Sequence, residues 1–437
     1  MARCLNPIEI PNPADWNKRQ LRFVTDCKVM RRYARDNIRP ILSDTITVPC
    51  GKCLACLKNK QSSMVVRCRR EAEQRGSFAF MTLTYDDDHL PLVESMWRVN
   101  PRTGEEEIVE KAEFVSTGFH PEKAYLDLFR DVPGSEQPRY WCHDHCRILD
   151  WFWQVRVTPS VCRQDVRQWL KQARIQYQRD YGEKLPDFSY VCISEYGPRS
   201  CRPHYHCAFF GLRRFHLNYL LNAWKFGKVK QVKMVQCRNK DGSSGFVKAS
   251  KYIGKYMSKG VYECQSVKSG EAQRPRVCQS MHFGTCDIEP IRSYLLCFDM
   301  VGEYDPQTLL SSDGTPLSRL AVDSLVREIP RRLVYRVDER TVLPLPRIIR
   351  DRIFKVADSE DKTKKVSVAL WSMVTAAIRD DLDRDRDQQF ADFCSVHPER
   401  TNSDNAREFA YWQAFCSGVE EAVMQEDFRS FYARSHF

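Results

Sequence analysis

The spacing of apolar and polar residues predicts a group of strands and helices in the middle of the chain. Residues 78–85 are rich in β-branched and aromatic side chains and end at Asp86-Asp-Asp, so they predict a strand. By the same criteria we expect further strands at residues 188–194, 204–210 and 229–235, and helices over residues 163–181, 217–224 and 249–258. The helices do not alternate strictly with the strands. An α+β fold, with an antiparallel sheet and helices packed on one face, is therefore favoured over a doubly wound parallel sheet.

The segments on either side of this group are less regular. Residues 90–160 combine Pro, Gly and the charged Glu105-Glu-Glu, and we expect an irregular insertion there. After residue 260 the pattern loosens until Ile329-Pro-Arg-Arg, and residues 364–382 then predict a helix. We therefore divide the chain into a basic, Cys-rich N-terminal segment, a central domain, and a C-terminal accessory region that is helical and acidic toward its end: residues 1–76, 77–262 and 263–437.

Charge is distributed unevenly along the 437 residues. Lys and Arg number 68 against 57 Asp and Glu, a formal net charge of +11. Residues 351–437 hold 12 basic and 17 acidic residues, so residues 1–350 carry a net charge of +16. A basic body with an acidic tail indicates a polyanionic partner, most simply nucleic acid. No apolar run could span a bilayer and the first residues lack a signal-peptide core, so we expect neither a membrane protein nor a secreted one.

Cysteine is unusually frequent, with 19 residues. In a reducing cytosol these are thiols or metal ligands. Cys50, Cys53 and Cys56 are each separated by two residues, with Gly-Lys between the first two, which is the usual shape of a zinc knuckle. A structural Zn²⁺ would need a fourth ligand, for which three cysteines are candidates: Cys4, Cys27 and Cys68. An inert turn in a Cys-rich chain explains the spacing equally well.

The sharpest candidate for chemistry is Pro203-His-Tyr-His. Residues two apart on a strand point to the same face, so His204 and His206 present two imidazoles side by side while Tyr205 points into the core. Two adjacent imidazoles form most of a divalent-metal site with positions open for substrate. Glu195, at the end of the preceding strand, could add a carboxylate ligand. Alone, a His-x-His pattern is weak evidence, because an accident of the core or surface explains it as well.

A tyrosine pair follows in Lys251-Tyr-Ile-Gly-Lys-Tyr-Met-Ser-Lys. Tyr252 and Tyr256 are four residues apart, on one face of the predicted helix. Lys255 and Lys259 lie on an adjoining stripe that suits contacts with phosphate. An ordinary amphipathic helix with half-buried tyrosines has the same spacing. A second His-x-His, at residues 143–145, lies in the expected insertion without a tyrosine pair after it, and we interpret it as a loop.

These elements, in this order, resemble the HUH endonuclease fold of rolling-circle replication initiators. Phe80-Met-Thr-Leu-Thr-Tyr-Asp-Asp is similar to the first motif of that superfamily, His204-Tyr-His to the second, and the pair of Tyr252 and Tyr256 to the third.

The surrounding words are similar to those in the replication initiators of small single-stranded DNA phages, the Microviridae of the gokushovirus kind. They are Cys50-Gly-Lys-Cys-Leu-Ala-Cys, Glu195-Tyr-Gly-Pro and Arg202-Pro-His-Tyr-His. The resemblance extends from Val48 to Lys259, is faint near residue 329 and is absent from the acidic tail. The long segment before residue 163 departs from it.

The resemblance implies an enzyme that nicks and rejoins origin DNA. Mg²⁺ or Mn²⁺ would be held by His204 and His206, with Glu195 as the candidate third ligand. The hydroxyl of Tyr252 or Tyr256 would attack the DNA, retain the 5′ phosphate as a phosphotyrosine and free a 3′ hydroxyl. The other tyrosine would cut the new junction and release circular single-stranded DNA. The charge of the transition state would be met by the metal and two lysines, Lys255 and Lys259.

The resemblance also implies partners. A host polymerase would extend the 3′ hydroxyl in the cytoplasm of a bacterial host. Because the chain has no Walker A motif, we expect a host helicase to separate the strands. One alternative is a relaxase or transposase of the HUH type, against which the two-tyrosine helix argues. Another is a non-enzymatic, zinc-containing DNA-binding protein. The sequence leaves open which tyrosine attacks first.

Overall fold

The computed structural model describes the following residues: 8–11, 45–51, 54–99, 106–110, 140–141, 152–197, 201–237, 244–257, 267, 269–285, 287–357, 362–363, 365–396 and 398. The chain divides into two compact units. One unit runs from Cys68 to Gly284, and the other combines Met1–Arg67 with Thr285–Phe437. The predicted boundaries at residues 76 and 262 stay predictions.

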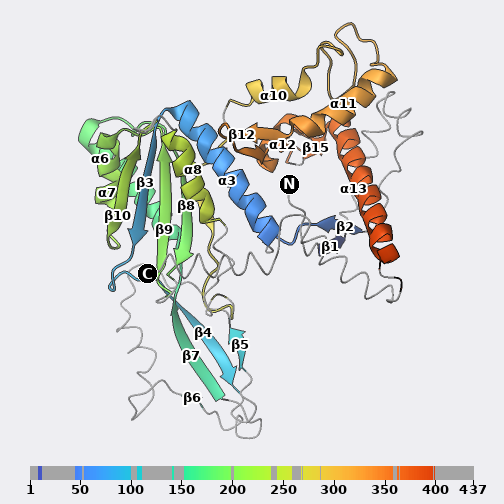
Figure 1. The fold of residues 1–437 in the computed structure, drawn as a ribbon. Coiled ribbons are helices and arrows are strands. Elements are labelled where there is room, and N and C mark those ends of the chain that lie inside the picture. The colour runs from blue at the N-terminus through green and yellow to red at the C-terminus, as the bar shows by residue number, and fades with distance from the viewer. Residues whose placement is uncertain are drawn as a thin grey trace, which may run out of the picture. The chain divides into compact units, whose positions relative to one another are not determined.

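The unit of residues 68–284 is built on a five-stranded antiparallel sheet (Figure 1). Its strand order is β10-β3-β9-β8-β11. The strands are β3 (Phe78–Thr84), β8 (Ser189–Tyr196), β9 (Pro203–Phe210), β10 (Val229–Val235) and β11 (Val277–Gln279). The α+β fold with an antiparallel sheet is therefore confirmed.

One face of this sheet packs against α6 (Arg163–Tyr181) and α7 (Arg214–Ala223). The core on this face combines alternate residues of β3 and β9 with the apolar stripe of α6. Trp169 of α6 lies edge-on to Phe209 of β9, with ring centroids 5.6 Å apart. Tyr205 points into the same core, as its alternation with the two histidines predicts, and is 3% exposed.

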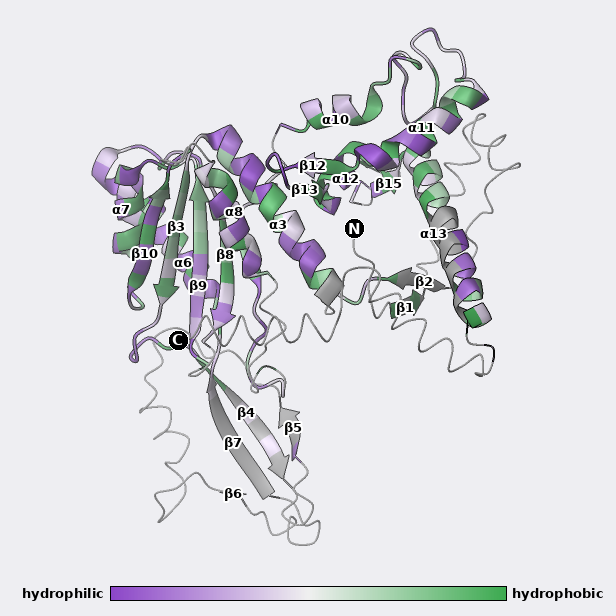
Figure 2. Cartoon of the chain, in the orientation of Figure 1, coloured by the Kyte–Doolittle hydropathy of each residue, from purple (hydrophilic) through white to green (hydrophobic). Residues whose placement is uncertain are grey.

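The opposite face is also covered, which corrects the expectation of helices on one face only. On that side α8 (Gly245–Lys255) packs Phe246 against Phe78 and Tyr252 against Phe80. The reason is that both sets of alternating side chains on β3 are apolar or aromatic, and β3 is hydrophobic along most of its length in Figure 2. A strand of this kind is stable only when both of its faces are buried.

The segment expected to be irregular contains a second sheet. Its order is β5-β4-β7-β6, and the strands are β4 (Leu92–Val99), β5 (Glu106–Glu110), β6 (Tyr140–Trp141) and β7 (Phe152–Pro159). β4 and β7 pair along their full lengths. The prediction failed here because these two partners are separated by more than fifty residues of sequence, so no local turn signal marks the pairing.

The other unit contains small sheets and helices. Its strands form three antiparallel pairs: β1 (Ile8–Pro11) with β2 (Thr45–Val48), β12 (Val334–Arg336) with β13 (Val342–Pro344), and β14 (Lys355–Ala357) with β15 (Lys365–Ser367). Its helices include α10 (Glu289–Leu296), α11 (Arg319–Arg332), α12 (Arg347–Phe354) and α13 (Ala369–Val396). α3 (Leu54–Arg75) begins in this unit and ends in the other. The helix predicted from residue 364 begins at Ala369, because the residues before it form β15.

In the part of the chain that the structure describes, no helix is both long and apolar enough to cross a bilayer.

Candidate metal and tyrosine site

The register of the central sheet brings the three predicted metal ligands together. β9 lies between β3 and β8, and Glu195 of β8 is directly opposite His204 of β9. His206 lies two residues further along β9, on the same face. Opposite residues on antiparallel strands have their Cβ atoms close together, so all three side chains converge at one end of the sheet.

The ligand atoms of Glu195, His204 and His206, which we call the metal-ligand group, lie within 4.8 Å of one another. Glu195 Oε2 is 3.0 Å from His206 Nε2 and 3.6 Å from His204 Nε2. All three side chains are largely buried. Two imidazole nitrogens and one carboxylate oxygen suit a divalent cation such as Mn²⁺ or Mg²⁺ and leave coordination positions open to a substrate. This is the one group of three or more such side chains found among the described residues.

The hydrogen bond of His204 fixes which nitrogen can take a metal. Its Nδ1 lies 3.3 Å from the backbone oxygen of Arg202. Because a carbonyl oxygen can only accept, Nδ1 carries the proton and Nε2 keeps its lone pair. Arg202 is itself held by bonds from its guanidinium to the side chain of Asp87 and, at 3.1 Å, to the backbone oxygen of Tyr85.

The predicted tyrosine pair lies directly on the metal-ligand group. The ring of Tyr256 stacks on the imidazole of His206, with centroids 3.6 Å apart and planes at 20°. The hydroxyl of Tyr256 donates to that of Tyr252 over 2.7 Å. Burial raises the pKa of Tyr256, and the hydrogen bond to Tyr252 and the charge of Glu195 raise it further. Tyr256 is buried and Tyr252 only half-buried.

One of the two predicted lysines lies beside this pair. The Lys255 ammonium is 4.4 Å from the ring centroid of Tyr252 and 5.4 Å from that of Tyr256. A cation at this distance favours negative charge on a phenolic oxygen or on a neighbouring phosphate. Lys259 lies outside the described residues.

The structure leaves the zinc prediction open. Cys50 is partly exposed and Cys56 is buried, while Cys53 and Cys4 lie outside the described residues. The second His-x-His, at residues 143–145, is also outside them. Gly51 has a φ of +74°, and its backbone oxygen accepts a hydrogen bond from Lys60 Nζ. A tight turn at Gly51 is compatible with a zinc knuckle and with an inert turn alike.

Sequence reasoning missed two neighbours of the metal-ligand group, Thr82 and Gln231. Thr82 lies opposite His206 on β3, and its hydroxyl contacts both His206 and Gln231. The available signal was a buried threonine in the middle of an otherwise apolar strand.

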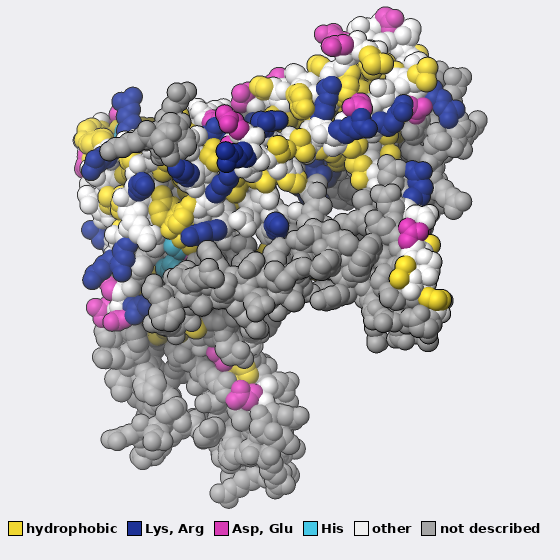
Figure 3. Space-filling model, viewed as in Figure 1, with side chains coloured by type: hydrophobic (Ala, Val, Ile, Leu, Met, Phe, Trp, Pro, Cys, Tyr) yellow, Lys and Arg dark blue, Asp and Glu magenta, His cyan; other side chains and the backbone are white. Residues whose placement is uncertain are grey.

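Sequence reasoning also missed the basic character of β10, an edge strand of the sheet. Four exposed lysines lie on β10 and the turn before it: Lys225, Lys228, Lys230 and Lys233. Figure 3 shows Lys and Arg side chains on the side of the molecule where β10 and α7 lie, with a histidine visible in the same view.

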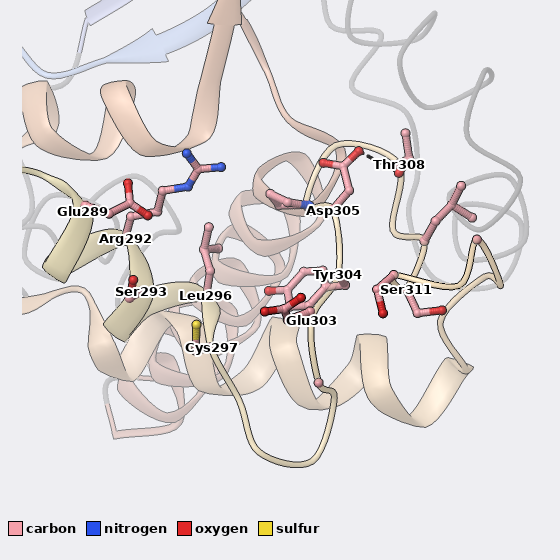
Figure 4. Close-up of a pocket in the computed structure, with 15 residues that line it drawn as sticks. Glu289, Arg292, Ser293, Leu296, Cys297, Glu303, Tyr304, Asp305, Thr308 and Ser311 are labelled. Carbon is pink, nitrogen blue, oxygen red and sulfur yellow. Dashed lines mark hydrogen bonds between the residues drawn. The ribbon is translucent and has the colours of Figure 1, made fainter.

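The other unit contains a cavity of about 760 Å³ that includes none of the predicted site residues. It is formed by α10 and the loop that follows it, and Figure 4 draws its lining. The acidic side chains in this lining are Glu289, Glu303 and Asp305. The Asp305 carboxylate is occupied by hydrogen bonds from Gln307 and Thr308 of its own turn.

The comparisons with known proteins single out the same part of the chain. Residues 154–261 match a family model described as a replication-associated protein of the ORF2 type. No curated protein and no solved structure matches the chain. The matched segment includes the metal-ligand group and both tyrosines, so the part of this chain that carries the candidate site is similar to proteins of DNA replication, which supports a replication initiator that binds DNA.

Proposed function

We propose that this protein initiates rolling-circle replication by cutting origin DNA with a tyrosine, in the manner of an HUH endonuclease. The observation that carries the proposal is the contact between the tyrosine pair and the metal-ligand group. The ring of one tyrosine stacks on His206, and the two phenolic hydroxyls are within hydrogen-bond distance of each other. The similarity of residues 154–261 to replication-associated proteins supports the same activity.

The metal-ligand group would hold a divalent cation through one oxygen and two nitrogens. When bound, Mg²⁺ or Mn²⁺ would polarise the scissile phosphate. The residues of the chain do the rest. A tyrosine oxygen bonds to phosphorus while the bond from phosphorus to the 3′ oxygen breaks. The 3′ oxygen retains the electron pair and takes up a proton, and the phenol loses one. Lys255 stabilises the negative charge at the phenolic oxygen and the phosphate.

Two adjacent tyrosines explain how one protein could both open and close a circle. The phosphotyrosine diester conserves the free energy of the broken bond, so the same chemistry can run backwards on a different 3′ hydroxyl. While one tyrosine holds the first 5′ end, the second can attack the newly made junction. The 2.7 Å separation of the two hydroxyls means that both can reach the same phosphate position with small side-chain movements. An HUH enzyme with a single nucleophile would not need this arrangement.

The lysines of β10 offer a surface for the DNA backbone. Their side chains are exposed, and none of the four has a carboxylate partner among the residues that the structure describes. Gln231, between Lys230 and Lys233, contacts Thr82 beside the metal-ligand group, so the basic strand leads directly to the candidate site. Unpaired lysines in a row suit sequence-independent contacts with phosphates.

The proposal includes the wider setting. The 3′ hydroxyl would be extended by a host polymerase, with a host helicase separating the strands, in the cytoplasm of a bacterial host infected by a phage of the Microviridae. Zn²⁺ would be a structural cofactor of the segment that contains Cys50, Cys53 and Cys56.

The test is a covalent adduct. Single-stranded oligonucleotides tiled across the genome that encodes the chain are incubated with the full-length protein and Mn²⁺, then separated on a denaturing gel. We expect an adduct on one tile, lost with EDTA, with His204→Ala and with the double change of Tyr252→Phe and Tyr256→Phe. If a folded wild-type protein forms no adduct on any tile but still binds DNA, the non-enzymatic DNA-binding alternative replaces this proposal.

A further inference from the structure

Thr82 connects the metal-ligand group to an irregularity in the neighbouring strand. It lies directly opposite His206 in the pairing of β3 with β9, and it is 7% exposed. Its hydroxyl oxygen is 3.2 Å from His206 Nδ1 and 3.1 Å from the side-chain oxygen of Gln231. A single hydroxyl therefore bridges a candidate metal ligand and the edge strand β10.

Gln231 reaches Thr82 because β10 contains a bulge. Lys230 is opposite Thr82 and Lys233 is opposite Phe80, so β10 uses one residue more than β3 over this interval. In a regular strand Gln231 would point to the face opposite that of Lys230. Its φ of +55° lies in the left-handed region, which is unfavourable for a residue with a Cβ atom. A bulge of this kind turns a side chain toward a site, and the strained backbone at Gln231 marks it as such a device.

The arrangement of donors and acceptors decides the proton position on His206. The Thr82 hydroxyl has one hydrogen, which it donates to the carbonyl oxygen of Gln231. Its oxygen can therefore only accept from His206, so Nδ1 of His206 carries the proton. The lone pair is then on Nε2, which is the atom that faces Glu195.

The position of His206 explains why a side chain is needed for this purpose. The Nδ1 of His204, near the start of β9, is held by the backbone oxygen of Arg202. His206 lies further inside a strand paired on both sides, where backbone carbonyls are engaged in the sheet. A side chain from the adjacent strand is the remaining source of an acceptor.

We propose that Thr82 and Gln231 are positioning residues that fix the tautomer of His206, so that its Nε2 is held ready as a metal ligand. The inference rests on the metal site of the proposed function. Outer partners of this kind orient the ring and strengthen the ligand, and losing one lowers metal affinity by about 10–100-fold. A purely structural role, joining β10 to β3, would leave metal affinity unchanged.

The test compares Thr82→Val, which keeps the shape of the side chain but removes the hydroxyl, with Thr82→Ser, which keeps the hydroxyl. Mn²⁺ affinity is measured on the full-length protein from the signal of free Mn²⁺ in electron paramagnetic resonance. We expect Thr82→Val to weaken binding by about 10–100-fold, and Thr82→Ser to retain wild-type affinity. Gln231→Gly, which relieves the backbone strain but removes the acceptor, should weaken binding, whereas Gln231→Glu should not.

A second readout concerns the proton itself. In the protein labelled with ¹⁵N-histidine and saturated with Mg²⁺, the His206 ring should carry its proton on Nδ1, with the signal assigned through His206→Gln. A proton on Nε2 would overturn the inference, as would equal Mn²⁺ affinity in the wild type, Thr82→Val and Gln231→Gly. If the wild type binds no Mn²⁺ at all, the metal site of the proposed function is wrong as well.

Discussion

The two tyrosines are chemically different although they are one helical turn apart. Tyr256 is buried, is stacked on His206, and uses its proton in the hydrogen bond to Tyr252. Burial raises the pKa of Tyr256, so ionising it in this arrangement is unfavourable. The oxygen of Tyr252 instead accepts that hydrogen bond, and the Lys255 ammonium lies over its ring. Both contacts favour a phenolate at Tyr252, which makes it the better first nucleophile.

Substitution of each tyrosine alone should separate the two steps. Tyr252→Phe is expected to abolish the first covalent adduct. Tyr256→Phe should still form it, at a rate lowered about tenfold, because one hydrogen bond to the nucleophile is lost. It should not join the cleaved end to a second oligonucleotide. Oligonucleotides labelled at either end follow both products on one gel. An adduct of undiminished yield in Tyr252→Phe would assign the first attack to Tyr256.

At the scale of single elements, sequence patterns located most of the site. The alternation in β9 predicted that His204 and His206 share a face, and the four-residue spacing in α8 predicted that Tyr252 and Tyr256 do. The pairing register is different in kind. Nothing in a strand of apolar residues states that Thr82 lies opposite His206, because register depends on the packing of the whole sheet. The bulge at Gln231 was unpredictable for the same reason.

The basic strand β10 permits a prediction about DNA affinity. Replacing Lys228, Lys230 and Lys233 by Gln should weaken binding to single-stranded DNA of any sequence. If all three contact phosphates, the slope of log affinity against log salt should become shallower by about 2, since each contact on a single strand contributes roughly 0.7. Fluorescence anisotropy over a range of salt concentrations measures the slope.

A matched triple change tests whether position matters in this prediction. Three exposed lysines outside β10 serve as the control: Lys171, Lys184 and Lys362. Their replacement by Gln removes the same charge but should change the slope less. If both triple variants behave alike, the effect comes from net charge, and β10 is not a specific DNA-binding surface.

The joint between α6 and β3 depends on a buried carboxylate. Asp165, in the first turn of α6, is fully buried and accepts a hydrogen bond of 2.7 Å from the hydroxyl of Tyr85, which follows β3. Burial raises the pKa of Asp165 above its usual value of 3.8, and the hydrogen bond from Tyr85 only partly opposes this effect. The folded protein therefore holds the proton of Asp165 more tightly than the unfolded chain does.

The shift at Asp165 makes stability depend on pH. Because the pKa is raised by folding, the stabilising contribution of the protonated form is complete below the unfolded pKa and is lost as pH rises through the folded pKa. Asp165→Asn keeps an oxygen for Tyr85 without the charge. We expect this variant to gain stability relative to the wild type as pH rises above about 4. Hydrogen exchange of the α6 and β3 amides, corrected for intrinsic rates, measures the difference. The exposed Asp88→Asn should show no such trend, and a flat difference for Asp165→Asn would contradict the argument.

At the scale of the whole molecule, the residues proposed for chemistry and the packing of the C-terminal helices belong to different compact units. The metal-ligand group and both tyrosines lie within the unit of residues 68–284. In the other unit, α13 is anchored by Trp371, whose ring stacks on the buried Phe354 with centroids 4.5 Å apart. The apolar first half of α13 thus belongs to a core, and a truncation made before it would remove a packing partner of Phe354 as well as acidic residues.

Trp371→Ala tests whether the two units are functionally separate. Losing a buried aromatic partner should destabilise the unit that contains α13 by about 3–5 kcal/mol, seen as faster hydrogen exchange in α11 and α13. Adduct formation on a short oligonucleotide should be unchanged below the unfolding temperature, because no residue proposed for cutting lies in that unit. The conservative Trp371→Phe should retain most of the stability. If Trp371→Ala loses the adduct while its exchange in β3, β8 and β9 stays slow, the C-terminal region contributes to cutting, and its role is catalytic or substrate-binding as well as structural.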